Sequence, residues 1–443
     1  MGKILGGYLF PHPPIIVEEI GRGGEKQAKK TLDGSKKLAK EIGNKKPSTI
    51  IIITPHGPLF RDAISISAEE SLRGNFAKFG RGDVNFEFQN NLELVEKILY
   101  ESSKEDITIA SIDKEFAKDY RVDLDIDHGA LVPLYFVNDE YKDYKLVHIT
   151  YSLFAPKKLY SFGKILQRIV LESEEEVIFT ASGDLSHRLS NDGPYAYSPV
   201  GEKFDKEIVD LFKKGDFQSI ASFDLELAED AGECGLRSLI ILAGFLDSRV
   251  VKASVLSYEG PFGVGYCTGK IHVGENKYIS LARRSLEYYV KEGQMMDVPK
   301  DIDNGLIEEK AGVFVTLQKD GKLRGCIGTI EPVENSIAQE IISNAVSAGI
   351  KDPRFPAVVE GELNELAYSV DVLGPTEVVV SPEELDVEKY GVIVSSGYRR
   401  GLLLPNLEGV DTIKEQIGIA LMKAGIGKDE DYVLERFEII RHI

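Results

Sequence analysis

The sequence predicts an α/β N-terminal domain, with a layered sheet covered by helices, followed by an α+β C-terminal domain. The chain has 443 residues, which is too many for one ordinary core and is typical of two domains. Short apolar runs at residues 49–54, 146–150 and 177–182 alternate with helical patterns, which indicates strands buried on both faces. Alternation of strands and helices favours an α/β layered core.

The helical patterns of the first domain occupy residues 25–42, 157–171 and 236–246. The polar segment 272–277 contains a glycine and is expected to be a linker, with Ser280 capping a helix over residues 281–290. We therefore predict domains over residues 1–275 and 278–443, each folding separately.

The second domain has a different pattern of elements. Amphipathic stretches predict helices, and apolar stretches predict strands; the helices fall at residues 336–348 and 413–424, and the strands at 312–317, 367–373, 391–394 and 401–404. This mixture without regular alternation indicates an α+β domain.

Composition narrows the class of partner. The formal net charge is −19, which disfavours binding to nucleic acid or to an anionic membrane, because each phosphate contact needs a Lys or Arg. A small-molecule substrate or a protein partner is favoured instead. The three cysteines are widely spaced, which indicates free thiols and a reducing, cytoplasmic location. Both a monomer and a homo-oligomer fit the sequence.

Four histidines lie in informative surroundings. His12 lies between prolines after an apolar stretch, and His56 follows the strand predicted at 49–54. His187 follows the strand predicted at 177–182, and His128 stands in a turn after an acidic stretch. Ligands bind at the carboxyl ends of strands in open α/β sheets, so these histidines are expected to share one site. His148, inside a strand-like run, is expected to be structural.

A metal site needs further ligands, and the start of the buried helix at 236–246 offers two. Glu233 and Cys234 are adjacent there, between glycines. Two histidines and one carboxylate form the facial triad of non-haem Fe(II) oxygenases. Acidic residues at a helix N-terminus are also explained by the helix dipole alone. Glu259, in a glycine-rich turn, is a weaker alternative ligand.

The N-terminal domain resembles the LigB-type class III extradiol dioxygenases and the Memo family, which shares their fold. The resemblance rests on His12, His56, the Asp127–Gly129 motif and residues 183–187, in this order. It implies that His12, His56 and Glu233 hold Fe(II) and that His187 acts as acid and base. It also implies that His128 orients a catechol-like substrate or oxygen.

The identity of the third metal ligand stays undecided at this point. The Memo branch presents a cysteine before a glycine where the dioxygenases have their glutamate, and this chain has both Glu233 and Cys234. A carboxylate suits Fe(II), whereas a thiolate favours a softer ion. We expect Glu233 to complete the site and Cys234 to pack.

Two motifs of the C-terminal domain, the strings LRGCIG at 323–328 and KDPRFP at 351–356, resemble the AMMECR-type domain. Cys326 lies between the glycines of the first string, and Arg324 is expected to lower its pKa. A nucleophilic or ligand-binding role for Cys326 stands beside a simpler one, a small thiol in a tight bend.

The leading hypothesis is a non-haem Fe(II)-dependent, extradiol-dioxygenase-like oxidoreductase with a ligand- or partner-binding AMMECR-type domain. The alternative is a non-oxygenase, Memo-like metal-binding module that serves a radical-SAM partner, a partnership that the pairing of these two domains implies.

Overall fold

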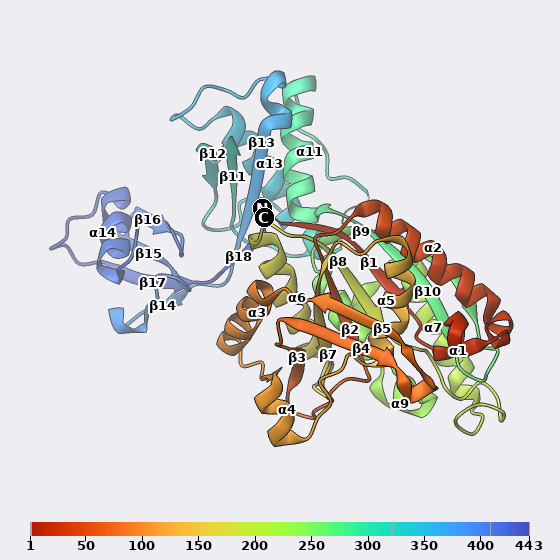
Figure 1. Ribbon diagram of the computed structural model, residues 1–443. Coiled ribbons are helices and arrows are strands. Elements are labelled where there is room, and N and C mark those ends of the chain that lie inside the picture. The colour runs from red at the N-terminus through yellow and green to blue at the C-terminus, as the bar shows by residue number, and fades with distance from the viewer. Residues whose placement is uncertain (1, 301, 303, 320–321, 408, 443) are drawn as a thin grey trace. The chain divides into compact units, whose positions relative to one another are not determined.

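The computed structural model describes residues 2–300, 302, 304–319, 322–407 and 409–442. The chain forms two compact units, Met1–Gly274 and Glu275–Ile443, shown in Figure 1. Each unit has its own hydrophobic core. That each unit folds without the other stays a prediction.

The first unit is built on an eight-stranded sheet with the order β6-β3-β7-β2-β8-β1-β10-β9. Its four central strands, β7, β2, β8 and β1, are parallel. The strands are β1 (Lys3–Phe10), β2 (Thr49–Thr54), β3 (Ile64–Ser67), β6 (Ile109–Ile112), β7 (Lys145–Thr150), β8 (Glu176–Ser182), β9 (Arg249–Glu259) and β10 (Tyr266–Asn276), and β4 (Ser71–Phe76) with β5 (Arg81–Gln89) forms a separate hairpin.

Helices cover both faces of this sheet. Ile51 and Ile53 of β2 belong to the core shared with α3, α6 and α10, whereas Ile50 and Ile52 belong to the core shared with α2 and α5. The helices are α1 (Glu18–Gly21), α2 (Lys29–Lys45), α3 (Leu92–Lys104), α4 (Lys114–Tyr120), α5 (His128–Glu140), α6 (Pro156–Glu172), α7 (Pro199–Lys214), α8 (Phe217–Ala221), α9 (Leu225–Ala231) and α10 (Leu236–Phe245). Alternate residues of β2 thus face opposite layers, so the α/β fold class is confirmed.

The second unit contains two four-stranded sheets, β12-β11-β13-β18 and β14-β17-β15-β16. Its strands are β11 (Val313–Lys319), β12 (Lys322–Gly328), β13 (Leu366–Leu373), β14 (Glu377–Val378), β15 (Gly391–Ser396), β16 (Arg399–Leu403), β17 (Val433–Phe437) and β18 (Ile439–His442). Its helices are α11 (Lys277–Glu292), α12 (Asn304–Glu308), α13 (Ile337–Ile350) and α14 (Ile413–Ala424). The α+β class is confirmed, although sequence analysis missed β12, β14, β17 and β18.

The linker predicted at 272–277 is wrong. Strand β10 continues to Asn276 and α11 begins at the next residue, so no loop separates them. Asn276 caps the helix by accepting a hydrogen bond from the backbone N of Tyr278 at 2.9 Å, while Ser280 lies inside the helix. The segment looked like a linker because the last residues of β10 alternate between partly buried and exposed positions and are therefore polar.

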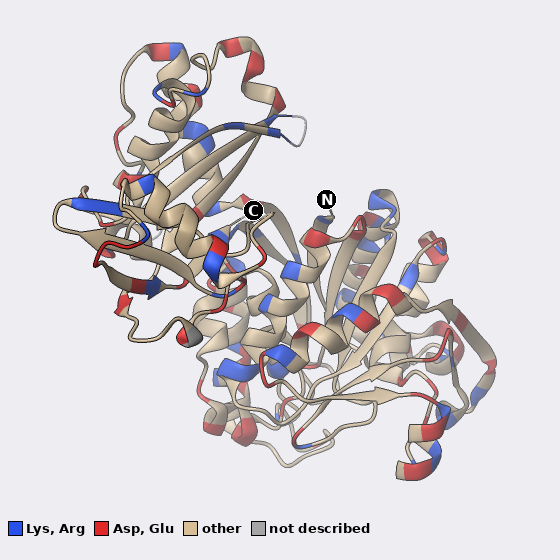
Figure 2. Ribbon diagram, turned by 90° about the vertical axis from the view of Figure 1, so that its left-hand side faces the viewer, with Lys and Arg blue, Asp and Glu red and all other residues tan. Residues whose placement is uncertain are grey.

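Basic and acidic residues are interspersed over both units (Figure 2). In the part of the chain that the structure describes, no helix is both long and apolar enough to cross a membrane.

Candidate metal centre

The site begins where three neighbouring parallel strands end. Phe10, the last residue of β1, is in register with Ser182, the last residue of β8, and Ile53 of β2 is in register with Ala181. Two residues beyond these strand ends stand His12, Asp184 and His56. The carboxyl ends of parallel strands meet at one edge of a sheet, which brings these three side chains together.

His12, His56 and His128 form a compact group of imidazoles. Each offers one ligand atom, and these atoms all lie within 4.8 Å of one another. The Nε2 atoms of His12 and His56 are 3.0 Å apart, and the rings of His56 and His128 stack with centroids 4.4 Å apart. His12 is buried and His56 is exposed, so the group opens to solvent on the His56 side. His128 was expected to orient substrate, but the structure places it among the candidate ligands.

Asp127 holds His128 in place. Its Oδ1 accepts hydrogen bonds from Thr54 Oγ1 at 2.6 Å and from Ala130 N at 3.3 Å, so Asp127 caps α5 and fixes His128 as the first helical residue. Its Oδ2 lies 2.9 Å from His148 Nε2. Although burial raises the pKa of Asp127, the hydrogen bonds from His148 and Thr54 and the charges of His148 and His56 together outweigh it, and the pKa falls below its usual range. His148 therefore supports the site through Asp127 without joining it.

The tautomer of His12 follows from Ser182. The Ser182 hydroxyl donates to the carbonyl oxygen of Gly129 at 2.5 Å, and Oγ lies 2.9 Å from His12 Nδ1. Because a hydroxyl has one hydrogen, Ser182 accepts the second bond and His12 Nδ1 carries the proton. The lone pair is then on His12 Nε2, which faces His56. This is the arrangement of metal-bound histidines, whose other nitrogen donates to a supporting group.

The imidazoles are neutral at physiological pH. Burial, followed by the charge of His56, lowers the pKa of His12 well below its ordinary value. Burial also lowers the pKa of His56. For His128, burial and the neighbouring His12 together lower the pKa to about 3. A metal ion binds the neutral form of imidazole, so the protonation state of the group fits a metal.

The expectation that Glu233 faces His12 and His56 is not met. Its Oε2 accepts a hydrogen bond from the backbone N of Leu236 at 2.6 Å, which caps the start of α10, and burial raises its pKa to about 7. Cys234 faces the histidines instead, with Sγ 3.7 Å from His12 Nε2. Adjacent residues at the start of a helix point in different directions, and the acid satisfies the free backbone N–H groups there.

Asp184 is a site residue that sequence analysis did not single out. Its Oδ1 accepts a hydrogen bond from His12 N at 2.9 Å, and its Oδ2 lies 3.8 Å from His12 Nε2. It is buried, which raises its pKa to about 6. Its position two residues after β8, matching His12 after β1 and His56 after β2, was the signal that could have found it.

His187 lies at the border of this group. Its Nε2 is 3.8 Å from Cys234 Sγ, and its ring stacks on Tyr195 with centroids 5.8 Å apart. Burial lowers its pKa, so it is a neutral base. Glu259, the weaker alternative ligand, accepts hydrogen bonds from the backbone and hydroxyl of Thr31 at 2.7 and 2.8 Å and is not placed at the histidines. Cys326 lies in the second unit, on β12.

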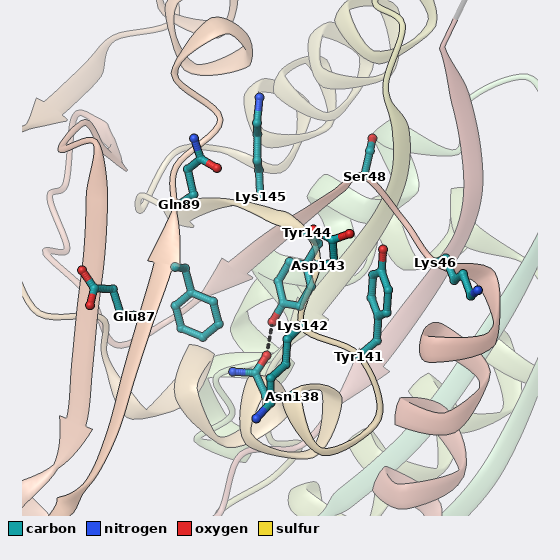
Figure 3. A pocket seen from close by; sticks show the side chains of 11 residues that line it. Lys46, Ser48, Glu87, Gln89, Asn138, Tyr141, Lys142, Asp143, Tyr144 and Lys145 are labelled. Carbon is teal, nitrogen blue, oxygen red and sulfur yellow. Dashed lines mark hydrogen bonds between the residues drawn. The ribbon is translucent and has the colours of Figure 1, made fainter.

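A separate polar pocket of about 530 Å³ lies at the opposite end of the same strands. Figure 3 shows its lining near Ser48 and Lys145, where β2 and β7 begin. Three lysines and two acids share this lining with aromatic rings: Lys46, Lys142, Lys145, Glu87, Asp143, Phe88, Tyr141 and Tyr144. It contains none of the histidines, which follow the carboxyl ends of the strands.

The first unit matches a known family. The chain belongs to the family of the catalytic LigB subunit of aromatic ring-opening dioxygenase, whose model matches residues 6–269. The AMMECR1 model matches residues 279–442. The resemblances to the LigB-type family and to the AMMECR-type domain are therefore confirmed.

One relative matches the chain across both domains. A protein of Clostridium acetobutylicum is 45% identical over 99% of this chain and 98% of its own length. A protein of Thermotoga maritima is 48% identical over 38% of this chain and 99% of its own length. Among solved structures, a Pyrococcus horikoshii protein is 34% identical, with a TM-score of 0.35 over 37% of this chain and 88% of that chain. An Escherichia coli K12 protein is 13% identical, with a TM-score of 0.41 over 60% of this chain and 99% of that chain.

The role given to Ser182 can be tested by substitution. We predict that Ser182→Ala weakens Fe(II) binding about 10- to 100-fold, because His12 loses the acceptor that fixes its tautomer and ring. Ser238→Ala is the matched control, since Ser238 Oγ donates to the Ser182 carbonyl at 2.8 Å but does not touch His12. Anaerobic titration with Fe(II) measures both variants. Equal affinity of Ser182→Ala and the natural protein would show that the hydroxyl does not set the tautomer.

Proposed function

We propose that the first unit is a metal-dependent oxidoreductase of the aromatic ring-opening dioxygenase type, with Fe(II) held by His12, His56 and His128. The observation that carries this proposal is the group of three neutral imidazoles with ligand atoms within 4.8 Å of one another. Imidazole is a suitable ligand for iron, and the membership of the LigB family supports the same reaction class. Bound there, Fe(II) would supply the redox chemistry between O₂ and an aromatic diol.

The surroundings of the open side favour a flat aromatic substrate. Phe79, which is 37% exposed, lies with its ring centroid 5.2 Å from that of His128. The stacked His56 and His128 rings continue this wall. Aromatic rings pack favourably in stacked or edge-to-face geometry, so Phe79 and the two imidazoles would orient a catechol-like ring beside the ligand atoms.

His187 would receive the phenolic proton. It is neutral because burial lowers its pKa, and it lies on the His12 side of the group, next to Cys234. A neutral imidazole near the reacting centre is suited to general base catalysis. Tyr195, stacked on its ring, would keep the imidazole in a fixed orientation.

One observation favours a second candidate function. Cys234 Sγ lies 3.7 Å from His12 Nε2, whereas the Glu233 carboxylate accepts a hydrogen bond from the backbone N of Leu236. A set of two imidazoles and a thiolate favours a softer ion such as Cu(I) or Zn, and a thiol at the ion is easily oxidised by O₂. The unit would then be a non-oxygenase metal module, serving a radical-SAM partner protein.

The roles assigned to His12 and His187 predict that one substitution removes the metal and the other removes activity. We expect His12→Ala to lose Fe(II), because it removes the most buried ligand. We expect His187→Ala to keep Fe(II) but to lose about two to four orders of magnitude of catechol-dependent O₂ uptake, as for the loss of a general base. His272→Ala, an exposed position on β10, is the control. A His12→Ala variant with unchanged metal content, or a metal-free His187→Ala variant, would contradict the assignment.

A pair of substitutions separates the two candidate functions. We expect both Glu233→Gln and Cys234→Ser to keep Fe(II), because Glu233 caps a helix and three imidazoles suffice as ligands. Metal analysis after anaerobic loading, together with O₂ uptake, measures the outcome. If Cys234→Ser loses its metal while Glu233→Gln retains it, the thiolate is a ligand and the oxygenase proposal gives way to the non-oxygenase module.

A further inference from the structure

A buried carboxylate lies next to the loop that carries the candidate base of the first unit. Asp205 stands on the buried face of α7 and is fully buried. Burial disfavours the charged form of an acid, and it raises the pKa of Asp205 to about 7. Aspartates are seldom found at such positions unless they are paired or hydrogen-bonded. An acid kept here therefore needs partners that offset the cost of burial.

Both oxygens of Asp205 have partners, and these partners come from different parts of the unit. Oδ1 accepts a hydrogen bond from the backbone N of Ser186 at 2.7 Å. Oδ2 accepts a hydrogen bond from the hydroxyl of Tyr258, on β9, at 2.7 Å. A carboxylate suits this position because each of its two oxygens can accept. Asp205 therefore ties Ser186, the residue before His187, to α7 and β9.

The segment before β10 leaves room for this carboxylate. A Cβ atom on Gly265 would lie 1.9 Å from Asp205 Oδ2, so only glycine allows the close approach. The backbone of Gly265 also pairs with the loop after β8. Leu185 N donates to Gly265 O, and Gly265 N donates to Ser186 O, both at 2.8 Å. The loop that carries His187 is thus held from α7 and from the start of β10 together.

Ser186 is held at each of its hydrogen-bonding groups. Besides its two backbone bonds, its hydroxyl donates to the carbonyl oxygen of Ala231 at 2.8 Å and accepts from the backbone N of Arg188 at 3.0 Å. The residue between Ser186 and Arg188 is His187, whose imidazole is the candidate base. The directions open to a side chain depend on its backbone angles. The bonds of Ser186 therefore restrict where the His187 imidazole lies.

We propose that Asp205 is a positioning residue for His187 and acts through the backbone of Ser186. This inference rests on the proposed function, in which the His187 imidazole receives the phenolic proton. The side-chain bonds of Asp205 go to Ser186 and Tyr258, so Asp205 neither binds the metal nor takes up that proton. Without Asp205 the loop after β8 loses one of its anchors, and the imidazole moves away from the reacting oxygen. A displacement of about 1 Å costs about 100-fold in rate.

The test compares kinetic constants and metal content of full-chain variants loaded anaerobically with Fe(II). Asp205→Ala should lower kcat for catechol-dependent O₂ uptake about 10- to 100-fold. KM and Fe(II) content should stay unchanged, because the contacts to metal and substrate remain. Asp205→Asn should recover most of kcat, since its amide oxygen still accepts from Ser186 N. Asp210→Ala, which changes an exposed acid of the same helix, is the matched control.

Two further variants separate the bonds of the carboxylate. Tyr258→Phe removes the bond at Oδ2 and keeps the bond to Ser186 N, so kcat should stay near its natural value. Gly265→Ala places a Cβ atom 1.9 Å from the position of Oδ2 and should displace the carboxylate. The loss of kcat in Gly265→Ala should therefore match that in Asp205→Ala, and Gly265→Ala decides the question where Asp205→Ala does not fold.

A measurement without turnover separates this inference from the proposed function. Burial lowers the pKa of His187 below its ordinary value of 6.5, and NMR titration of the imidazole in the metal-free chain measures it. In Asp205→Ala the pKa of His187 should rise toward the ordinary value, because the ring leaves its partly buried position. If the natural protein takes up no O₂ with any catechol, the proposed function fails, and the titration still decides whether Asp205 positions His187.

Two kinds of result would overturn the inference. The first is a pKa of His187 that stays at its natural value in Asp205→Ala, since the ring would then lie where it did before. The second is a loss of Fe(II) or a raised KM in Asp205→Ala, because Asp205 would then support the unit as a whole and not the base in particular.

Discussion

The parallel pairing of β1, β8 and β2 determines where the chemistry of the first unit lies. Backbone ladders hold these strand ends in register, Phe10 against Ser182 and Ile53 against Ala181. The loops that follow are joined again by the bond from His12 N to Asp184 Oδ1. A Cβ atom on Gly183 would lie 2.2 Å from the Cα of Gly235, so the loop after β8 touches the loop before α10. This close approach, possible only without side chains, brings Cys234 beside Asp184 and His12.

Burial then sets the charge of the site. It lowers the pKa of the histidines and raises those of Asp184 and Cys234, so each group is moved toward its neutral form. A cluster of neutral imidazoles offers lone pairs without a strong field of its own, and a cation supplies the missing charge. The hydrogen bond between His12 and Ser182 fixes where one of these lone pairs points.

Sequence patterns could predict the layers and the strand ends, because continuous apolar runs such as 49–54 need two covered faces. They placed His12 and His56 at those ends for the same reason. They favoured Glu233 over Cys234, because the side chain that faces the histidines depends on how the turn before α10 meets Gly183, which sequence patterns do not reveal. They also missed Asp184. Its side chain accepts a hydrogen bond from the backbone N of His12, which is 172 positions away in the sequence.

The second unit shows a related limit. The string around Cys326 suggested a bend between glycines, but it forms β12, because its pairing with β11 outweighs the weak strand preference of glycine. The hydrogen-bond partners of Cys326 come from Thr316 on β11 and from Asp352 and Arg354 after α13, and only the tertiary structure brings them together.

The central claim, that three imidazoles form the metal centre, is tested most directly by X-ray absorption spectroscopy of the protein loaded anaerobically with Fe(II). The account predicts a shell of nitrogen or oxygen ligands at about 2.0–2.2 Å, with the multiple-scattering pattern of about three imidazoles and no sulfur. A sulfur ligand at about 2.3 Å would contradict the account, because it would make Cys234 a ligand in place of His128.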